Sequence, residues 1–164
     1  RLEQAIADTA VETFDVEAGL ASCCTAYQDI YRERDIVYRN TAQGPLRVAG
    51  SADLIAQLLD MLVANAVSSS PAGSRMDVTL GSDAGELELA VVNRGSRLPA
   101  KMREELCDWL VSIGEHGDGR PHLGLGLHVV ALIAAFHGGR VAADDLADGT
   151  GVVFKVWLPR EVTG

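Results

Sequence analysis

Apolar residues recur at steps of three and four along four segments, a spacing that predicts amphipathic helices. The strongest segment runs from Ser51 to Ser70 and carries a stripe of leucine, isoleucine and valine on one side. Either Ser51 or Asp53 can cap its first turn. The other segments cover residues 2–11, 17–34 and 124–136. The last of these is apolar almost all round, so we expect that helix to be buried.

Alternation of apolar and polar residues predicts two β-hairpins. The first pairs residues 76–80 with residues 87–91, and the second pairs residues 140–142 with residues 152–158. Counting by two along the second strand of the first hairpin brings the inward face to Asn93, an amide where an apolar residue would continue the series. A buried amide needs a hydrogen-bonding partner.

Shorter elements complete the predicted α/β domain. Strands are expected at residues 13–16, 36–38 and 46–48, and a short helix is expected through Leu106 and Leu110. A polar, glycine-containing stretch follows at residues 112–122, which is typical of a mobile loop.

Composition limits the classes of protein that fit. The chain has 164 residues, 48% hydrophobic and 23% charged, which suits one globular domain and excludes disorder of the whole chain. Four large residues are available for a core: Trp109, Trp157, Phe136 and Phe154. A net charge of −9, from 14 Lys and Arg against 23 Asp and Glu, argues against binding to nucleic acid or anionic lipid. The first residues lack an initiator methionine and a signal-peptide pattern, so we expect a piece of a longer protein.

Cysteine and histidine give no metal-binding pattern. Cys23, Cys24 and Cys107 lack the spacing of a zinc site, which favours a reducing, cytoplasmic compartment without structural zinc. The four histidines are His116, His122, His128 and His137. None begins a long amphipathic helix with a charged neighbour, so we expect structural roles or a place in a loop for each of them.

Two other features carry candidate chemistry. Gly124 and Gly126 open a helix, where free N–H groups and the helix dipole suit a phosphate. Asn65 offers a carbonyl oxygen to a hard cation such as Mg²⁺, and Gln57, Met61 and Ser68 lie on the same side of its helix. Each feature has an ordinary alternative, because glycines also end helices and most helical asparagines are plain surface residues.

The order of these pieces resembles the catalytic and ATP-binding domain of bacterial sensor histidine kinases. Asn65 lies in Leu62-Val63-Ala64-Asn65-Ala66, and Asn93 begins Asn93-Arg94-Gly95-Ser96-Arg97. His122-Leu123-Gly124-Leu125-Gly126-Leu127 follows, and Gly149-Thr150-Gly151 precedes the terminal strand. The resemblance covers roughly Phe14 to Pro159. It implies a Bergerat-type ATP-binding fold, an α/β two-layer sandwich in which a mixed, mostly antiparallel sheet packs on three helices.

The resemblance also implies the site. Asn65 would be the magnesium ligand, Asn93 would accept from the adenine amino group, and Gly95 would let the base approach the backbone. The full set of nucleotide-binding candidates is Asn65, Ser68, Asn93, Gly95, Arg120, Gly124, Leu125, Gly126, Leu127, Thr150 and Gly151. The cofactors implied are ATP and Mg²⁺, with no covalent catalytic residue in this chain.

Several positions depart from the family pattern. Asn93 replaces the usual aspartate, and Arg97 replaces the second glycine of the same motif. Met61 stands where hydrolytic relatives such as the gyrase and Hsp90 ATPases have a general-base glutamate, so rapid hydrolysis to water is not expected. Ser68 stands where a lysine or arginine often faces the phosphates, and His122 replaces a leading glycine. Arg120 is a candidate to supply the missing positive charge.

Three interpretations follow. In the first, the domain binds Mg-ATP and donates the γ-phosphate to a histidine on a separate dimerisation domain in two-component signalling. In the second, it is a degenerate kinase-like domain that binds nucleotide weakly or not at all and serves as a docking or phosphotransfer scaffold for a response regulator. In the third, it is a plain α/β domain, which leaves the ordered motifs unexplained.

The first interpretation implies a division of the chain and a set of partners. Residues 1–13 would be the end of a dimerisation helix or a linker, and residues 14–164 the catalytic domain, with a lid around residues 111–123. The partners would be the histidine-bearing domain of the same kinase and a receiver domain of a response regulator, with no nucleic acid and no direct membrane contact. The location would be cytoplasmic, as part of a kinase that is itself soluble or anchored in a membrane.

Overall fold

The computed structural model describes residues 1–94 and 125–161. Several predictions lie outside these residues: the helix through Leu106 and Leu110, the lid at residues 111–123, and the positions of Cys107, Trp109, His116 and His122.

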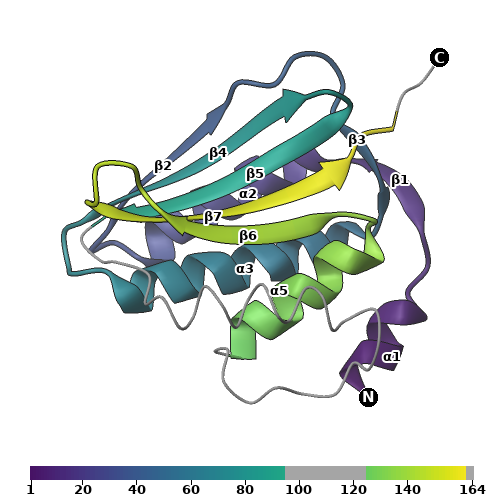
Figure 1. The fold of residues 1–164 in the computed structure, drawn as a ribbon, viewed down its shortest axis with the longest axis horizontal. Coiled ribbons are helices and arrows are strands. Elements are labelled where there is room, and N and C mark those ends of the chain that lie inside the picture. The colour runs from purple at the N-terminus through teal and green to yellow at the C-terminus, as the bar shows by residue number, and fades with distance from the viewer. Residues whose placement is uncertain (95–124, 162–164) are drawn as a thin grey trace.

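A five-stranded sheet forms one layer of the domain (Figure 1). Its strands, in spatial order, are β2 (Asp35–Asn40), β4 (Arg75–Asp83), β5 (Glu86–Arg94), β7 (Gly151–Pro159) and β6 (Arg140–Asp145). β2 runs parallel to β4, and each of the other neighbouring pairs is antiparallel. The sheet is therefore mixed and mostly antiparallel, which confirms the predicted fold class.

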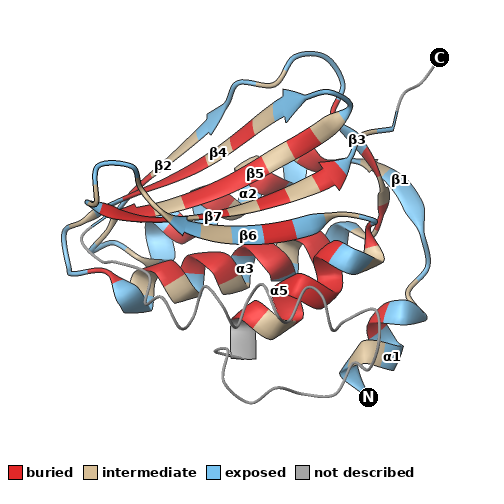
Figure 2. Ribbon diagram, viewed as in Figure 1, coloured by how far each residue is buried: buried red, intermediate tan, exposed pale blue. Residues whose placement is uncertain are grey.

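Helices cover one face of the sheet and form the second layer. Those that pack on it are α2 (Val16–Ile30), α3 (Ala52–Ser69) and α5 (Leu125–Phe136). A short helix, α1 (Leu2–Ala7), packs against α5. A separate two-stranded ladder joins β1 (Glu12–Asp15) to β3 (Arg47–Gly50). Figure 2 shows that buried residues gather on one side of α3 and lie almost all round α5, as its nearly continuous apolar sequence predicts.

Local sequence accounts for the start and end of the main elements. The Ser51 hydroxyl accepts a hydrogen bond from the Leu54 N–H, so Ser51 is the N-cap of α3. Ala84 and Gly85 both have positive φ, as a two-residue turn between β4 and β5 requires. At the end of α5, Gly138 has a φ of +73° and the Gly139 N–H donates to the Ala134 carbonyl.

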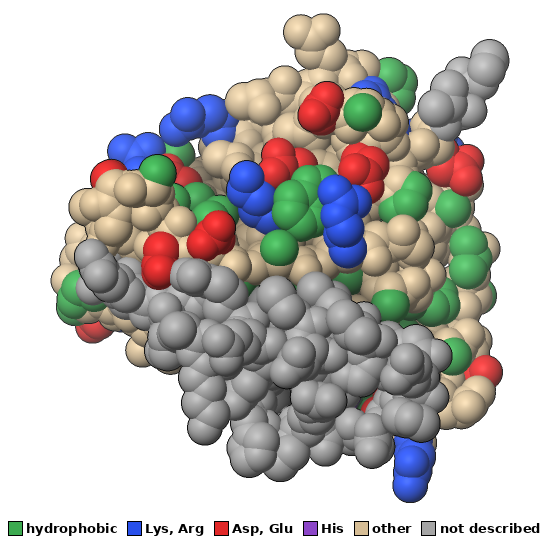
Figure 3. All heavy atoms as spheres, in the orientation of Figure 1, with side chains coloured by type: hydrophobic (Ala, Val, Ile, Leu, Met, Phe, Trp, Pro, Cys, Tyr) green, Lys and Arg blue, Asp and Glu red, His purple; other side chains and the backbone are tan. Residues whose placement is uncertain are grey.

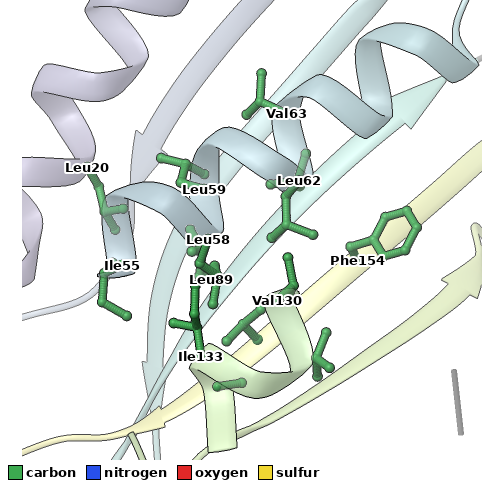
Figure 4. Packing of buried hydrophobic residues seen from close by; sticks show 14 of the residues in the cluster. Leu20, Ile55, Leu58, Leu59, Leu62, Val63, Leu89, Val130, Ile133 and Phe154 are labelled. Atoms are coloured by element: carbon green, nitrogen blue, oxygen red, sulfur yellow. The ribbon is translucent and has the colours of Figure 1, made fainter. Parts of the chain in front are cut away.

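The core lies between the two layers (Figure 4). Leu58 and Leu62 of α3 and Ile133 of α5 are fully buried against the sheet residues Leu89 and Phe154. Among the described helices, α3 alone is long and apolar enough to cross a bilayer. Its seven buried residues face the core, which is the arrangement of a core helix in a folded domain.

Trp157 lies on the outer face of the sheet, so the prediction that it belongs to the core was wrong. The residue lies between the inward residues Val156 and Leu158 and therefore points to the opposite face. There the Arg140 guanidinium lies 4.4 Å from the centre of its ring. Arg140 also pairs with Glu86, at 2.7 Å. Figure 3 shows hydrophobic side chains between acidic and basic ones on this face.

Two helices are shorter than their patterns indicate. α1 ends at Ala7 rather than at residue 11, because β1 begins at Glu12 and pairs with β3. α2 ends at Ile30 rather than at residue 34. Arg34 instead turns back and donates to the Val67 and Ser70 carbonyls at the end of α3.

Candidate functional site

The end of β5, the start of β7 and the C-terminal end of α3 lie at the same end of the domain, on the left in Figure 1. α3 and α5 meet at the other end, where the Ser51 N–H donates to His137 Nε2 at 3.0 Å. The predicted site residues on β5, β7 and α3 therefore lie at one end of the sandwich, away from the junction between α3 and α5.

Asn93 is a polar residue buried at the end of an apolar series, which is unusual among the predicted site residues. It is 1% exposed and lies on the helix-facing side of β5, in register with Met76 on one side and Val152 on the other. The preceding inward residues of this strand are Leu87, Leu89 and Val91. The prediction of an inward amide at the end of this apolar series is confirmed.

Gly151 and Thr150 lie beside the end of β5. A β-carbon on Gly151 would overlap the Asn93 carbonyl oxygen and lie 2.9 Å from the Arg94 Cα, so only glycine fits here without a shift of backbone. The Thr150 hydroxyl donates to the Asp148 carboxylate at 2.6 Å and accepts from the Arg94 guanidinium at 3.4 Å. The hydrogen bonds from Thr150 lower the pKa of Asp148, and Arg94 adds to that effect.

Arg94 was missed by the sequence analysis as a site residue. It follows Asn93 directly and lies opposite Gly151 in the ladder between β5 and β7. Its position next to the inward-facing Asn93 was the one feature of the sequence that could have indicated a place in the site. Its contact with Thr150, however, depends on a strand pairing across more than fifty residues. Arg94 thus adds a cation to this end of the sheet.

Asn65 and Ser68 lie in the last turns of α3. Asn65 is half-buried, and its backbone carbonyl accepts from the hydroxyls of Ser68 at 3.0 Å and Ser69 at 2.9 Å. Ser68 is exposed, whereas Met61, one turn before Asn65, packs against the hydrophobic core. The amide oxygen of Asn65 is the type of ligand that suits Mg²⁺.

The remaining predicted residues belong to α5 or lie outside the described residues. Leu125 and Gly126 lie in the first turn of α5, and Leu127 is buried, 1% exposed. Gly95, Arg97, Arg120 and Gly124 lie outside the described residues. Among the predicted residues, the structure brings together Asn93, Thr150 and Gly151 as one group, and Asn65 and Ser68 as another.

The two described histidines have structural surroundings. His137 is buried between the Ser51 N–H and the Ile133 carbonyl, which lies 2.8 Å from Nδ1. Because Nε2 accepts, the ring is neutral with its proton on Nδ1. Burial lowers the pKa of His137. His128 Nε2 lies 3.9 Å from Glu3 Oε1, and burial lowers its pKa while Glu3 acts in the opposite direction. The structural role predicted for His137 is confirmed.

The fold and the order of these residues define a class of protein. Residues 50–162 match the family described as "Histidine kinase-, DNA gyrase B-, and HSP90-like ATPase", so the chain belongs to that family. Its fold is that of histidine kinase catalytic domains.

Individual relatives support this assignment. The chain is 29% identical over 147 residues to "Sensor-like histidine kinase SenX3" of Mycobacterium tuberculosis, covering 88% of this chain and 35% of the relative. It therefore spans about a third of that relative's length. Among solved structures, it is similar to the catalytic domain of histidine kinase ThkA, with a TM-score of 0.76, 21% identity, and coverage of 93% of this chain and 98% of the other. Full-length ShkA has a TM-score of 0.78 and 21% identity over 100% of this chain and 34% of its own.

Proposed function

We propose that this chain binds Mg-ATP and donates the γ-phosphate to a histidine on a separate dimerisation domain. The observation that carries the proposal is the placement of Asn93, a fully buried amide on the apolar side of the sheet, at the same end of the domain as Asn65. Such an amide suits a base that presents hydrogen-bonding groups at its edge. The similar structure of ShkA is described as a complex with AMPPNP, an ATP analogue.

The chain's own residues have separable roles in this proposal. Asn65 would hold the metal through its amide oxygen, and Asn93 would accept from the base. Gly151 and Thr150 would close the base end of the site, and the first turn of α5, with Gly126, would direct N–H groups at the phosphates. Magnesium would neutralise phosphate charge when bound. The chain itself positions the nucleotide rather than forming a covalent intermediate.

The partners and the location belong to the same proposal. Residues 1–13 would connect to the dimerisation domain and residues 14–164 would form the catalytic domain, with its lid around residues 111–123. The receiver domain of a response regulator would be the second partner, as histidine kinase ThkA is described in complex with response regulator protein TrrA. These steps would take place in the cytoplasm, where catalytic domains of sensor kinases act.

A thermal shift with Mg-ADP tests nucleotide binding directly. A ligand at 100 times its Kd stabilises the native state by about 2.7 kcal/mol, which for a domain of this size raises Tm by several degrees. The shift should require magnesium and should disappear in Asn65→Ala. Gln57→Ala, an exposed change two turns earlier on α3, is the matched control and should keep the full shift. An unchanged Tm in the parent chain would contradict the proposal.

One observation favours the alternative of a degenerate scaffold. Met61 packs against the core and Ser68 is a neutral exposed residue, so α3 brings neither a general base nor a cation to Asn65. If Mg-ADP leaves Tm unchanged but a receiver domain still binds the chain, the scaffold interpretation replaces the kinase interpretation.

A further inference from the structure

The C-terminal end of α3 is held by one side chain from another part of the chain. Arg34, in the turn between α2 and β2, donates from Nη2 to the Val67 carbonyl at 3.0 Å and to the Ser70 carbonyl at 2.8 Å. Its Nε donates to the Ser70 hydroxyl at 3.3 Å. The last carbonyls of a helix have no partner within the helix, so Arg34 supplies donors that α3 lacks. Its side chain is 11% exposed, which shields these contacts from water.

The backbone on both sides of Arg34 is fixed as well. The Gly73 N–H donates to the Glu33 carbonyl at 2.6 Å, and the Asp35 N–H donates to the Ser74 carbonyl at 3.1 Å. Asp35 is also the first residue of β2, a strand of the five-stranded sheet. Arg34 is therefore anchored to the sheet and to the turn after α3, and its side chain joins the end of α3 to that frame.

Asn65 lies in the part of α3 that Arg34 holds. A helix rises by about 1.5 Å per residue, so the Val67 carbonyl is only about 3 Å along the axis from Asn65. The Asn65 carbonyl accepts from the hydroxyls of Ser68 and Ser69, which belong to the same end of the helix. Those two contacts move with the helix end, whereas the contacts from Arg34 connect it to the sheet.

The charge of Arg34 also suits this position. The C-terminal end of a helix carries partial negative charge, and α3 has no basic residue in its last turn. Arg34 brings a cation to that end from outside the helix. Glu33 approaches its guanidinium to 3.9 Å but is 83% exposed, so it offsets little of this charge. The helix end would therefore repel a nearby phosphate less than an uncapped one.

We propose that Arg34 is a positioning residue for the magnesium ligand Asn65, an inference that rests on the nucleotide-binding function proposed above. Mg²⁺ demands near-ideal octahedral geometry, so a ligand on a frayed helix end would hold it poorly. Arg34 keeps the last turns of α3 in one place and lowers the electrostatic cost of bringing phosphates there. In this role it acts through α3 and touches neither the metal nor the nucleotide.

Titration calorimetry with Mg-ADP on variants of Arg34 tests the proposal. Arg34→Met keeps an unbranched side chain but removes the charge and the donors. We expect its Kd to rise by about tenfold or more, as is typical when a group that orients a metal ligand is removed. Arg34→Lys keeps the charge and can donate to the same carbonyls, although without the fork of a guanidinium, so it should recover most of the affinity.

A magnesium titration at a fixed ADP concentration separates positioning from a loss of stability. The magnesium concentration that gives half of the full rise in Tm should increase in Arg34→Met, because the proposed metal ligand Asn65 is the group displaced. A change that only destabilises the fold would lower Tm at every magnesium concentration and leave this midpoint unchanged.

Ser51→Ala is the matched control. It removes the side-chain cap at the opposite end of the same helix, where the Ser51 hydroxyl accepts from the Leu54 N–H. It should destabilise α3 without disturbing the end that carries Asn65. The Kd of Mg-ADP and the magnesium midpoint should both stay at the values of the parent chain.

The outcomes separate this inference from the function on which it rests. If the parent binds Mg-ADP and folded Arg34→Met has the same Kd and magnesium midpoint, the inference is overturned and the proposed function stands. Equal losses of affinity in Arg34→Met and Ser51→Ala also overturn it, because they report a general loss of stability. Failure of the parent chain to bind overturns both. If Arg34→Met does not fold, Arg34→Gln, which keeps one amide donor without the charge, takes its place under the same criteria.

Discussion

Gly151 abuts Asn93 so closely that the start of β7 has no room for a side chain: a β-carbon there would overlap the Asn93 carbonyl oxygen. The glycine is required by this close approach and not by its φ, which is not in the left-handed region. The contact connects the base end of the proposed site to the ladder between the two central strands β5 and β7.

Gly151→Ala should therefore destabilise the domain, because the β-carbon meets backbone atoms that cannot rotate away. We expect the free energy of unfolding to fall by about 1–3 kcal/mol, measured by urea denaturation. Gly19→Ala is the control, since Gly19 lies in α2 with nothing near its added β-carbon. That change should raise stability by about 1 kcal/mol. Equal stability of Gly151→Ala and the parent would show that β7 can shift freely.

His137 should make stability depend on pH below neutrality. Its Nε2 accepts from the Ser51 N–H and its folded pKa is lowered by burial, so protonation breaks the contact. A lowered folded pKa means that the contribution is complete above the ordinary histidine pKa, near 6.5, and is lost as the pH falls through the folded value. Urea denaturation from pH 7.5 to 5 should show stability falling with acid, with a contribution from this one group of at most about 1.4 kcal/mol per pH unit.

His137→Gln separates this group from the others that titrate in the same range. Glutamine keeps an acceptor for the Ser51 N–H but does not titrate. The free energy of unfolding of His137→Gln should therefore fall less steeply than that of the parent chain as the pH is lowered. The remaining slope would include a contribution from His128, whose folded pKa is also lowered by burial. Parallel slopes in the parent and His137→Gln would contradict the assigned role.

Ile6→Ala should loosen the contact between α1 and α5. Ile6 is 5% exposed and belongs to the core, so truncation should cost about 2 kcal/mol. Hydrogen exchange should become faster in residues 2–7 and in the part of α5 that they cover. Leu2→Ala is the control, since Leu2 is 46% exposed, and its effect should stay within about 0.5 kcal/mol. Unchanged protection of residues 2–7 in Ile6→Ala would refute the docking of α1.

Ser68→Lys should strengthen nucleotide binding if the phosphates lie beside the last turns of α3. Ser68 is exposed, and a lysine near the C-terminal end of a helix is also favourable to the helix dipole. We expect Mg-ADP to bind about three- to tenfold more tightly, with the gain reduced at high salt. Ser69→Lys adds the same charge at the next exposed position and should gain less. Equal gains at both positions would indicate a general charge effect.

Elements with a strong local pattern were predictable from the sequence. The stripe on α3 follows from helical spacing and is confirmed. For the cap, the sequence left Ser51 and Asp53 as alternatives, and the structure shows Ser51. The inward position of Asn93 follows from the alternation of inward and outward side chains along β5. The same alternation along β7 predicts that Trp157 points outward, because its neighbours Val156 and Leu158 point inward. The expectation of a buried Trp157 relied on the size of its side chain and was wrong.

Relationships between distant segments were not predictable in this way. The parallel pairing of β2 with β4, and the pairing of β1 with β3, depend on how the helices pack. The approach of Gly151 to Asn93 depends on the register between β5 and β7, which local alternation leaves open. Asn65 could be placed on a helix, whereas its location at the same end as Asn93 became visible only in the folded sandwich.

The packing of α1 on α5 couples the position of residues 2–7 to the position of α5. Close-packed side chains transmit displacement instead of absorbing it, so a movement of α1 is passed to α5 through Ile6 and through the Glu3–His128 pair. α5 in turn carries Gly126 in its first turn and is held at its far end by His137 and Ser51. Force applied near residue 1 would thus pivot α5 about its fixed C-terminal end, and its first turn would travel the farthest.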